Sequence, residues 1–406
     1  MVGDASLTGV AAAGEFGVSL NHPNVDTVTV PDGAVWFVGA AWADGGAPIR
    51  VSILVDGENF LPESTDLWQF TSSNAADMTA LGVGDGSVFA GDADGGLYSL
   101  DAGDGSAGFN VDVVEGIDDV IYEETTASVV LTKSNAIAAY NPDDGSLLYE
   151  NFPPRNVTDD IASAGDGVVY GSSMDGYVLA LDPADGTLLW EAQVGGGGNY
   201  GRGIDVTSDG STVYATYDVA TAIGLYTVDT ATQSPGQELA LIDGEIPTCL
   251  TLGPNEDVVV VGSNQGNARF FDVETGDVVF TESVGQEAFS VVSSDEYVFI
   301  GDADGSVSAH EPTGELVYAI SPTQTSIDSL APDPAGGGVY VGSESGNSTV
   351  YYYVESPLYS GARLYSGTGE LRADEYAYGG DVVSIGVHEP KFDQAYRLSI
   401  REIVSP

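Results

Sequence analysis

The chain alternates apolar and polar residues in short runs that are separated by turn residues. One apolar run, residues 168–171, is followed by Asp175-Gly176 and by a second alternating run, residues 177–182. Alternation with a period of two predicts half-buried β-strands. Asp-Gly pairs suit tight turns, because glycine accepts a positive φ and aspartate bonds to nearby backbone. No stretch of helical period is longer than about one turn, so the pattern predicts an all-β fold.

The same pattern returns along the chain at a nearly constant spacing of about 38 to 46 residues, the blade period of propeller repeats. A repeat of about four short antiparallel strands predicts a β-propeller with seven blades, or eight if the chain ends add one. The small residues that end the first apolar run are Gly91, Gly171, Gly262, Gly301 and Gly342, and Lys133 and Thr216 hold this place in two degenerate copies.

The second half of the repeat reads Ala180-x-Asp182-x-x-x-Gly186-x-x-x-Trp190, which resembles the repeat of quinoprotein-like β-propellers. The resemblance covers residues from about 75 to 370. It implies that the aromatic residue packs between adjacent blades and that the aspartate and glycine shape the turn. The same spacing returns in Asp101…Gly105…Phe109, Asn141…Gly145…Tyr149 and Asp272…Gly276…Phe280.

The resemblance also suggests one activity, quinone-dependent dehydrogenation. Enzymes of that family are longer and usually exported. They hold the quinone over the channel with a metal ion, a stacked tryptophan and often a vicinal disulfide. Here Cys249 is the only cysteine, and we find only Trp190 within a repeat. We therefore expect no cofactor and no enzymatic activity, and keep the dehydrogenase as an alternative.

The charge is extreme. The chain carries 62 acidic and 10 basic residues, for a net charge of −52, yet 43% of its residues are hydrophobic. That apolar content is enough for a folded core. Self-repulsion of this size strains a fold in dilute buffer. At molar salt the Debye length is about 3 Å, so the repulsion between these charges is largely screened. We therefore expect a protein of an extreme halophile, either an archaeon or its virus.

The same charge argues against two classes of partner. A surface without a basic face cannot neutralise phosphates, so we expect no nucleic acid. We also expect no membrane insertion, since the longest near-apolar stretch, residues 35–43, is too short to span a bilayer. Residues 1–7 lack a basic segment, a long apolar segment and paired arginines, which predicts no signal peptide and a location in the cytoplasm or a virion.

The two ends lack the repeat. We expect an N-terminal strand region at residues 1–66, the propeller at 67–376 and C-terminal strands at 377–406. The ends form either a small β-sandwich or a blade that closes the ring. The segment Thr27-Val28-x-Val30-Pro31-x-Gly33-x-x-Trp36 resembles β-sandwich modules of viral tail and fibre proteins, which favours the sandwich.

The candidate metal ligands in the sequence lack the spacing of a known metal site. His22, His310 and His388 do not have metal-ligand spacing, and His310 takes a strand position that other repeats fill with leucine. Asp92-x-Asp94-Gly95 and Asp302-x-Asp304-Gly305 resemble half of a calcium loop but lack its distal glutamate. We interpret both as tight turns, with a structural cation as the alternative, and expect no catalytic or metal-binding residues.

Tyrosines crowd into one stretch near the C-terminus. A tyrosine ring with its polar tip suits recognition of a protein or a glycan. We therefore predict a non-enzymatic propeller that belongs to a larger assembly, most concretely a virion surface or host-attachment protein. A cellular scaffold for protein assembly is the alternative. The residues of the predicted binding surface are Tyr351, Tyr352, Tyr353, Tyr359, Tyr365, Tyr376 and Tyr378.

Overall fold

The computed structural model describes residues 66–354, except 73–75, 195–199, 220–221, 285, 321–324, 335–337 and 344–348, together with the backbone of strands from the two chain ends. The chain divides into two compact units. One comprises residues 1–65 and 355–406, and the other residues 66–315 and 321–354, with residues 316–320 joined to the second by strand pairing.

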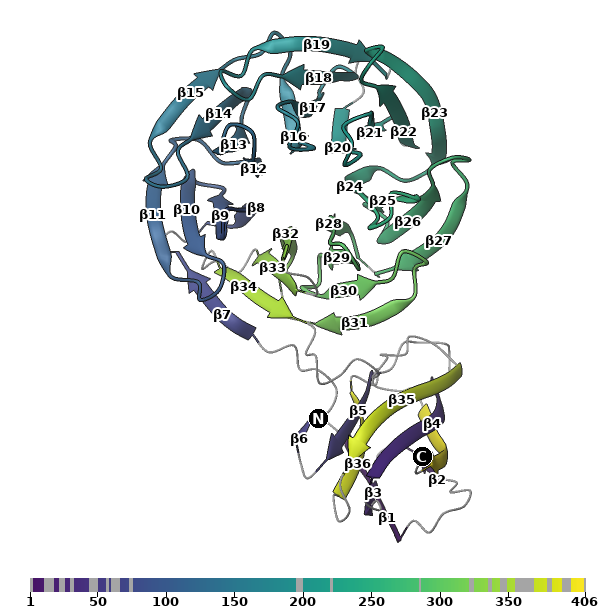
Figure 1. Ribbon diagram of the computed structural model, residues 1–406. Helices are drawn as coiled ribbons and strands as arrows, with labels where there is room; N and C mark the ends of the chain where they lie inside the picture. The colour runs from purple at the N-terminus through teal and green to yellow at the C-terminus, as the bar shows by residue number, and fades with distance from the viewer. Residues whose placement is uncertain are drawn as a thin grey trace. The chain divides into compact units, whose positions relative to one another are not determined.

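The larger unit is a β-propeller, which confirms the predicted fold. Seven four-stranded antiparallel sheets stand around a central channel (Figure 1). Each inner strand lines the channel, and the chain then passes outward strand by strand. The inner strands are β8 (Met78–Gly84), β12 (Asp119–Glu123), β16 (Val157–Ala162), β20 (Tyr200–Val206), β24 (Pro247–Leu252), β28 (Ala288–Ser293) and β32 (Ile327–Pro332).

The second and third strands of each blade form its buried centre, because the neighbouring blades cover both of its faces. Every residue of β13, β25 and β33 is buried, which explains continuous apolar runs such as Val258 to Val261. The second strands are β9 (Ser87–Asp92), β13 (Ser128–Lys133), β17 (Val169–Ser173), β21 (Thr212–Asp218), β25 (Val258–Ser263), β29 (Val298–Asp302) and β33 (Gly338–Ser343). The third strands are β10 (Gly96–Asp101), β14 (Ala136–Tyr140), β18 (Tyr177–Leu181), β22 (Ala222–Asp229), β26 (Asn267–Asp272), β30 (Val307–His310) and β34 (Thr349–Val354).

The ring closes by pairing an early strand with a late one. The outer strand β7 (Asp66–Thr71) pairs with β34, which lies more than 270 residues later in the chain. Trp68 stabilises this closure, since its indole Nε1 donates to the carbonyl of Ala102 (3.0 Å) and its ring lies 5.7 Å from that of Tyr340. The other outer strands are β11 (Ala107–Asp112), β15 (Leu147–Asn151), β19 (Leu188–Gln193), β23 (Ser234–Asp243), β27 (Val278–Ser283) and β31 (Leu316–Ile320).

In several repeats the aromatic residue packs against the next blade, as the family resemblance implies. A Cβ added at Gly186 would lie 2.7 Å from the ring of Tyr149, and one at Gly145 would lie 2.7 Å from Phe109. Both glycines also have a positive φ, near +70°. The turn therefore needs glycine for two reasons, its backbone conformation and the aromatic ring that covers it. Trp68 makes the same contact with Gly105. The expectation that Trp190 is the only tryptophan within a repeat was therefore wrong.

The chain ends form sheets of their own. One sheet has the order β1-β3-β36-β5-β6 and the other β2-β37-β4-β35. Among the strands described, none of these pairs with a propeller strand, so the ends do not complete a blade. The strands are β1 (Gly3–Val10), β2 (Val18–Asn21), β3 (Asp26–Thr29), β4 (Gly33–Ala43), β5 (Arg50–Val55), β6 (Glu58–Asn59), β35 (Gly369–Ala377), β36 (Val382–His388) and β37 (Tyr396–Val404).

The predicted C-terminal domain boundary needs correction. Strand β35 pairs with β4 along its whole length, from Gly369 opposite Ala41 to Ala377 opposite Gly33. The propeller therefore ends with β34 and does not extend to residue 376. The tyrosine-rich stretch concealed the boundary, because tyrosines occur both in β34, as Tyr351 to Tyr353, and in β35, as Tyr376.

Candidate functional site

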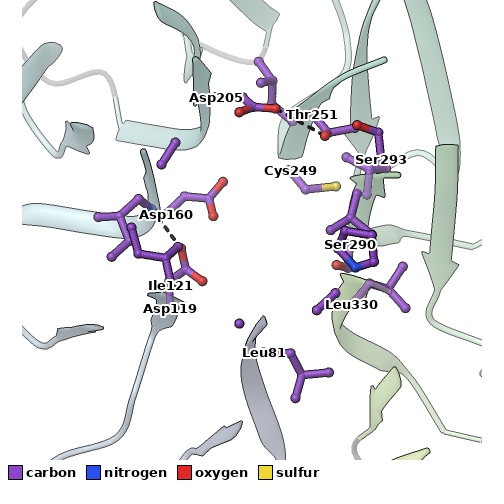
Figure 2. A pocket seen from close by; sticks show the side chains of 18 of the residues that line it. Leu81, Asp119, Ile121, Asp160, Asp205, Cys249, Thr251, Ser290, Ser293 and Leu330 are labelled. Carbon is purple, nitrogen blue, oxygen red and sulfur yellow. Dashed lines mark hydrogen bonds between the residues drawn. The ribbon is translucent and has the colours of Figure 1, made fainter. Parts of the chain in front are cut away.

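The central channel is a cavity of about 800 Å³. The inner strands line it with a mixture of carboxylates, hydroxyls and aliphatic side chains. In Figure 2, Asp119 and Asp160 lie next to each other on one side of the cavity, and Ser290 lies opposite. These carboxylates cannot be distinguished in the sequence from the other acidic residues, of which the chain has 62 in all.

Three channel carboxylates connect consecutive blades. Asp119 on β12 accepts a hydrogen bond from the backbone N–H of Ile161 on β16 (2.9 Å). Asp160 on β16 accepts one from Ile204 on β20 (3.2 Å), and Asp205 on β20 accepts one from Leu252 on β24 (2.7 Å). Each aspartate thus satisfies a backbone donor that the next inner strand would otherwise expose to the channel.

Hydroxyl groups make equivalent links between other blades. Thr79 Oγ1 donates to the carbonyl of Ile117 (2.5 Å), Thr248 Oγ1 donates to that of Ala288, and Ser329 Oγ donates to that of Met78 (3.0 Å). Each of these residues lies at a register shift of its inner strand or directly beside one. A β-bulge re-aims a side chain, which here directs it toward the neighbouring blade.

Partial burial of the three aspartates changes their acidity. Loss of solvation raises the pKa of Asp119 to about 7 and that of Asp205 to about 6, although backbone N–H donors oppose the shift. Burial also raises the pKa of Asp160 well above its usual value, and the neighbouring Asp119 charge adds to this effect. Asp119 and Asp160 therefore form a pair that retains a proton near neutral pH.

The channel residues do not fit the quinone site that the family resemblance suggests. The residues that line the cavity include no tryptophan. Its cysteine, Cys249, is buried and has no second cysteine to pair with. Burial raises the pKa of the Cys249 thiol to about 12, which keeps it protonated and unreactive.

The other residues considered for metal binding have structural roles. Asp92 Oδ1 accepts from the backbone N–H groups of Asp94 (3.0 Å) and Gly96 (2.6 Å) and thereby stabilises the turn between β9 and β10. Asp302 does the same for Asp304 and Ser306, both at 2.9 Å. Within the described part of the chain, no cluster of three or more histidine, cysteine or acidic residues has a metal-binding arrangement. The same part contains no helix long and apolar enough to cross a bilayer.

His310 is a strand residue of β30, as the sequence predicts. It is fully buried, with Nδ1 3.1 Å from the carbonyl oxygen of Gly314 and Nε2 2.9 Å from Ser308 Oγ. Burial lowers the pKa of His310 to about 4, so the ring is neutral at physiological pH. His22 lies outside the described residues, and His388 ends β36 in the terminal unit.

The structure divides the predicted tyrosine surface between the two units. Tyr351, Tyr352 and Tyr353 lie in β34 of the propeller, where Tyr352 is opposite Trp68 and Tyr340. Tyr376 lies in β35 of the terminal unit, opposite Ala34. Tyr359, Tyr365 and Tyr378 lie outside the described residues.

The two ends of the channel differ in composition. We call the end where the inner strands begin the upper end; it carries the loops between blades and the hairpins between second and third strands. In residues 66–354 every lysine and arginine lies there: Lys133, Arg155, Arg202 and Arg269. The opposite, lower end carries the remaining turns, and its charged residues are all acidic in the described part.

Exposed apolar side chains also gather at the upper end. Val114 is 83% exposed and Phe152 67% exposed, and both lie in loops between blades. Met174, Tyr200 and Phe289 lie at the same end and are also exposed. A second set faces outward from outer strands and consists of Leu147, Leu148, Leu189, Leu241, Val278 and Val279.

Comparison with known proteins agrees with the fold and points to one family. The family described as outer membrane protein assembly factor BamB matches residues 61–238. This propeller is thus similar to BamB. The match covers less than half of the chain, and together with the ring of sheets it confirms the quinoprotein-like β-propeller.

Solved structures support the fold alone. A crystal structure of the computationally designed Ika8 protein has a TM-score of 0.54 and 16% sequence identity to this chain. The alignment covers 71% of this chain and 99% of that one. No curated protein matches the chain.

Proposed function

We propose that this protein is a non-enzymatic, protein-binding propeller that acts as a scaffold in a larger assembly. The observation that carries the proposal is the set of exposed apolar side chains at the upper end of the channel, with Phe152 and Val114 the most exposed. Large apolar side chains that gather on one face of a protein mark interaction sites, whereas single exposed apolar residues are normal. The similarity of residues 61–238 to an assembly factor supports the same role.

The channel supports a binding role over a catalytic one. A catalytic carboxylate has to reach a substrate, but the oxygens of Asp119, Asp160 and Asp205 accept hydrogen bonds from the backbone of the next blade. Cys249 and His310, the other candidate groups, are buried and hold protonation states unsuited to catalysis near neutral pH. These residues stabilise the ring.

The proposal is tested by isolating the protein from its native source in molar salt, followed by cross-linking and mass measurement. A scaffold should purify in a complex of fixed stoichiometry with at least one other protein. A monomer that has no partner and that turns over a quinone or another substrate would contradict the proposal.

We further propose that the assembly belongs to an extreme halophile and is exposed on a virion. Support comes from the net charge of −52 and from the terminal unit, whose sheets combine strands of both chain ends. Mass spectrometry of purified virions and of host cytosol separates the two locations. Abundance in the cytosol and absence from virions would favour the cellular scaffold.

A further inference from the structure

Three exposed side chains at the upper end form what we call the Phe152 patch: Val114, Phe152 and Met174, with exposed fractions of 83%, 67% and 41%. They come from consecutive blades. Val114 follows β11, Phe152 follows β15, and Met174 lies in the hairpin between β17 and β18. The amide Nδ2 of Asn156, in the same loop as Phe152, lies 4.0 Å from the sulfur of Met174.

Two cations hold these loops in place. Lys133 Nζ donates to the carbonyl of Val113 (3.0 Å), next to Val114, and pairs with Glu150 (2.7 Å), close to Phe152. It therefore connects the first two loops of the patch through a largely buried ammonium group.

Arg155 makes the equivalent connection to the third loop. It forms a bidentate pair with Glu191 (2.7 and 2.9 Å), also pairs with Asp175 beside Met174, and lies 3.4 Å from the centre of the Tyr177 ring. Fixed loops lose little conformational entropy when a partner binds. The patch is thus preorganised for binding.

The backbone at Val114 supports a role beyond loop structure. Its φ is +76°, in the left-handed region, although valine is β-branched. Such a conformation is strained for valine, and strained backbone of this kind clusters at functional sites. The strain places an apolar side chain where asparagine or glycine would be the favourable choice.

The charges around the patch indicate the kind of partner. Lys133 and Arg155 are already paired, and carboxylates outnumber them. A partner that covers this site must bring its own positive charge, since burying uncompensated carboxylates is costly. The surrounding acidic residues are Asp112, Glu115, Glu150, Asp175 and Glu191.

From this arrangement we infer that the Phe152 patch binds a protein segment whose apolar side chains are flanked by lysine or arginine. The inference rests on the proposed protein-binding function and adds the surface and the chemistry of the partner. Apolar contact supplies the attraction that persists in molar salt, and short-range charge pairs supply the selectivity.

The test uses the full chain in molar potassium chloride and three synthetic peptides, which alternate leucine with arginine, leucine with glutamate, and serine with arginine. Each peptide carries a fluorescent dye at its N-terminus, so that binding to the unmodified protein raises the fluorescence anisotropy of the peptide. The leucine–arginine peptide should bind at least tenfold more tightly than the other two. Failure of this peptide to bind, or equal binding by all three, overturns the inference.

A double variant, Phe152→Ser with Met174→Ser, should weaken binding of the leucine–arginine peptide by about tenfold or more, given the apolar area lost. The matched control is Leu189→Ser with Val279→Ser, which removes similarly exposed side chains from outer strands and should leave binding unchanged. An equal loss in both variants, with native circular dichroism, contradicts the assignment to this patch. A concentration-dependent dimer that only the first variant abolishes identifies a second copy as the occupant and also overturns it.

The native assembly separates failure of this inference from failure of the proposed function. If the isolated complex survives Phe152→Ser with Met174→Ser but is lost in the outer-strand variant, the patch is wrong and the scaffold function stands. If the wild-type protein forms no complex, the scaffold function itself fails.

Discussion

The carboxylate of Asp119 accepts a hydrogen bond from the backbone N–H of Ile161 in the adjacent blade, at 2.9 Å. The contact recurs between the next two pairs of blades, through Asp160 and Asp205. The polar residues of the channel wall therefore act between blades. Changing one should alter the stability of the ring, and this gives the channel carboxylates a measurable role.

Stability should depend on pH through these aspartates. The pKa of Asp119 rises to about 7 and that of Asp205 to about 6, from a usual value of 3.8. Between about pH 4 and pH 7 the folded state therefore binds more protons than the unfolded state. The free energy of unfolding should fall as pH rises through this window and level off above it.

Asp160→Asn tests this dependence, since the amide keeps an acceptor for Ile204 and removes one charge from the coupled pair. We expect the variant to be more stable than wild type at pH 8 by about 1 to 2 kcal/mol, allowing for screening by channel solvent, and to differ little at pH 4. Chemical unfolding in molar salt at both pH values measures this. Asp143→Asn, at an exposed turn, is the control. Equal effects of the two substitutions on stability would contradict a destabilising interaction between the charges of Asp119 and Asp160.

Gly186→Ala should be among the most damaging turn substitutions. Its φ is +70°, and the new Cβ would lie 2.7 Å from Tyr149 and 3.0 Å from Ile137. We expect a loss of about 2 to 4 kcal/mol, from backbone strain and overpacking together. Gly86→Ala is a matched control with a similar φ, +73°, and no atom within 4 Å; it should cost only about 1 kcal/mol. Similar losses of unfolding free energy in the two variants would show that the contact of Gly186 with Tyr149 contributes nothing to stability.

Sequence periodicity was sufficient to predict the propeller, because each repeat encodes local structure. Alternation specifies strands, Asp-Gly specifies turns, and Gly186 with Tyr149 encodes the contact between blades. The end of the propeller was harder to place. Pairing of β35 with β4 joins residues more than 300 positions apart, and no local pattern specifies such a partner.

The candidate sites were less accessible to sequence reasoning. Asp119, Asp160 and Asp205 differ from other acidic residues only in lying on first strands of their blades, directly before an isoleucine or a valine. That signal becomes useful once the blade register is known. The Phe152 patch depends on three loops that meet at one end of the ring, so no single segment reveals it. The predicted tyrosine surface stays a prediction, since Tyr351, Tyr352 and Tyr353 lie in β34 of the propeller and Tyr376 lies in β35 of the terminal unit.

Val114→Asn should raise stability while weakening partner binding. Asparagine tolerates a positive φ better than a β-branched residue does. Relief of the strain at φ +76° should therefore add about 1 kcal/mol to the free energy of unfolding. The removed side chain is 83% exposed, so it contributes little to the core. Chemical unfolding and binding of the leucine–arginine peptide measure the two effects. A variant that is less stable and binds normally would show that Val114 is positioned for loop structure alone.

Salt should determine whether the ring holds together. Turn carboxylates at the lower end, such as Asp104, Asp144 and Asp185, are exposed, and bonds from serine or threonine hydroxyls lower their pKa values and keep them charged. No lysine or arginine lies at that end in the described chain. Dilution from molar salt to 0.1 M increases the Debye length from about 3 to 10 Å, so the carboxylates repel one another over a longer distance. We expect the melting temperature to fall by about 10 °C or more, with loosening visible by circular dichroism. Sucrose at matched osmolarity is the control for general solvent effects, and an unchanged melting temperature in low salt would reject adaptation to extreme salinity.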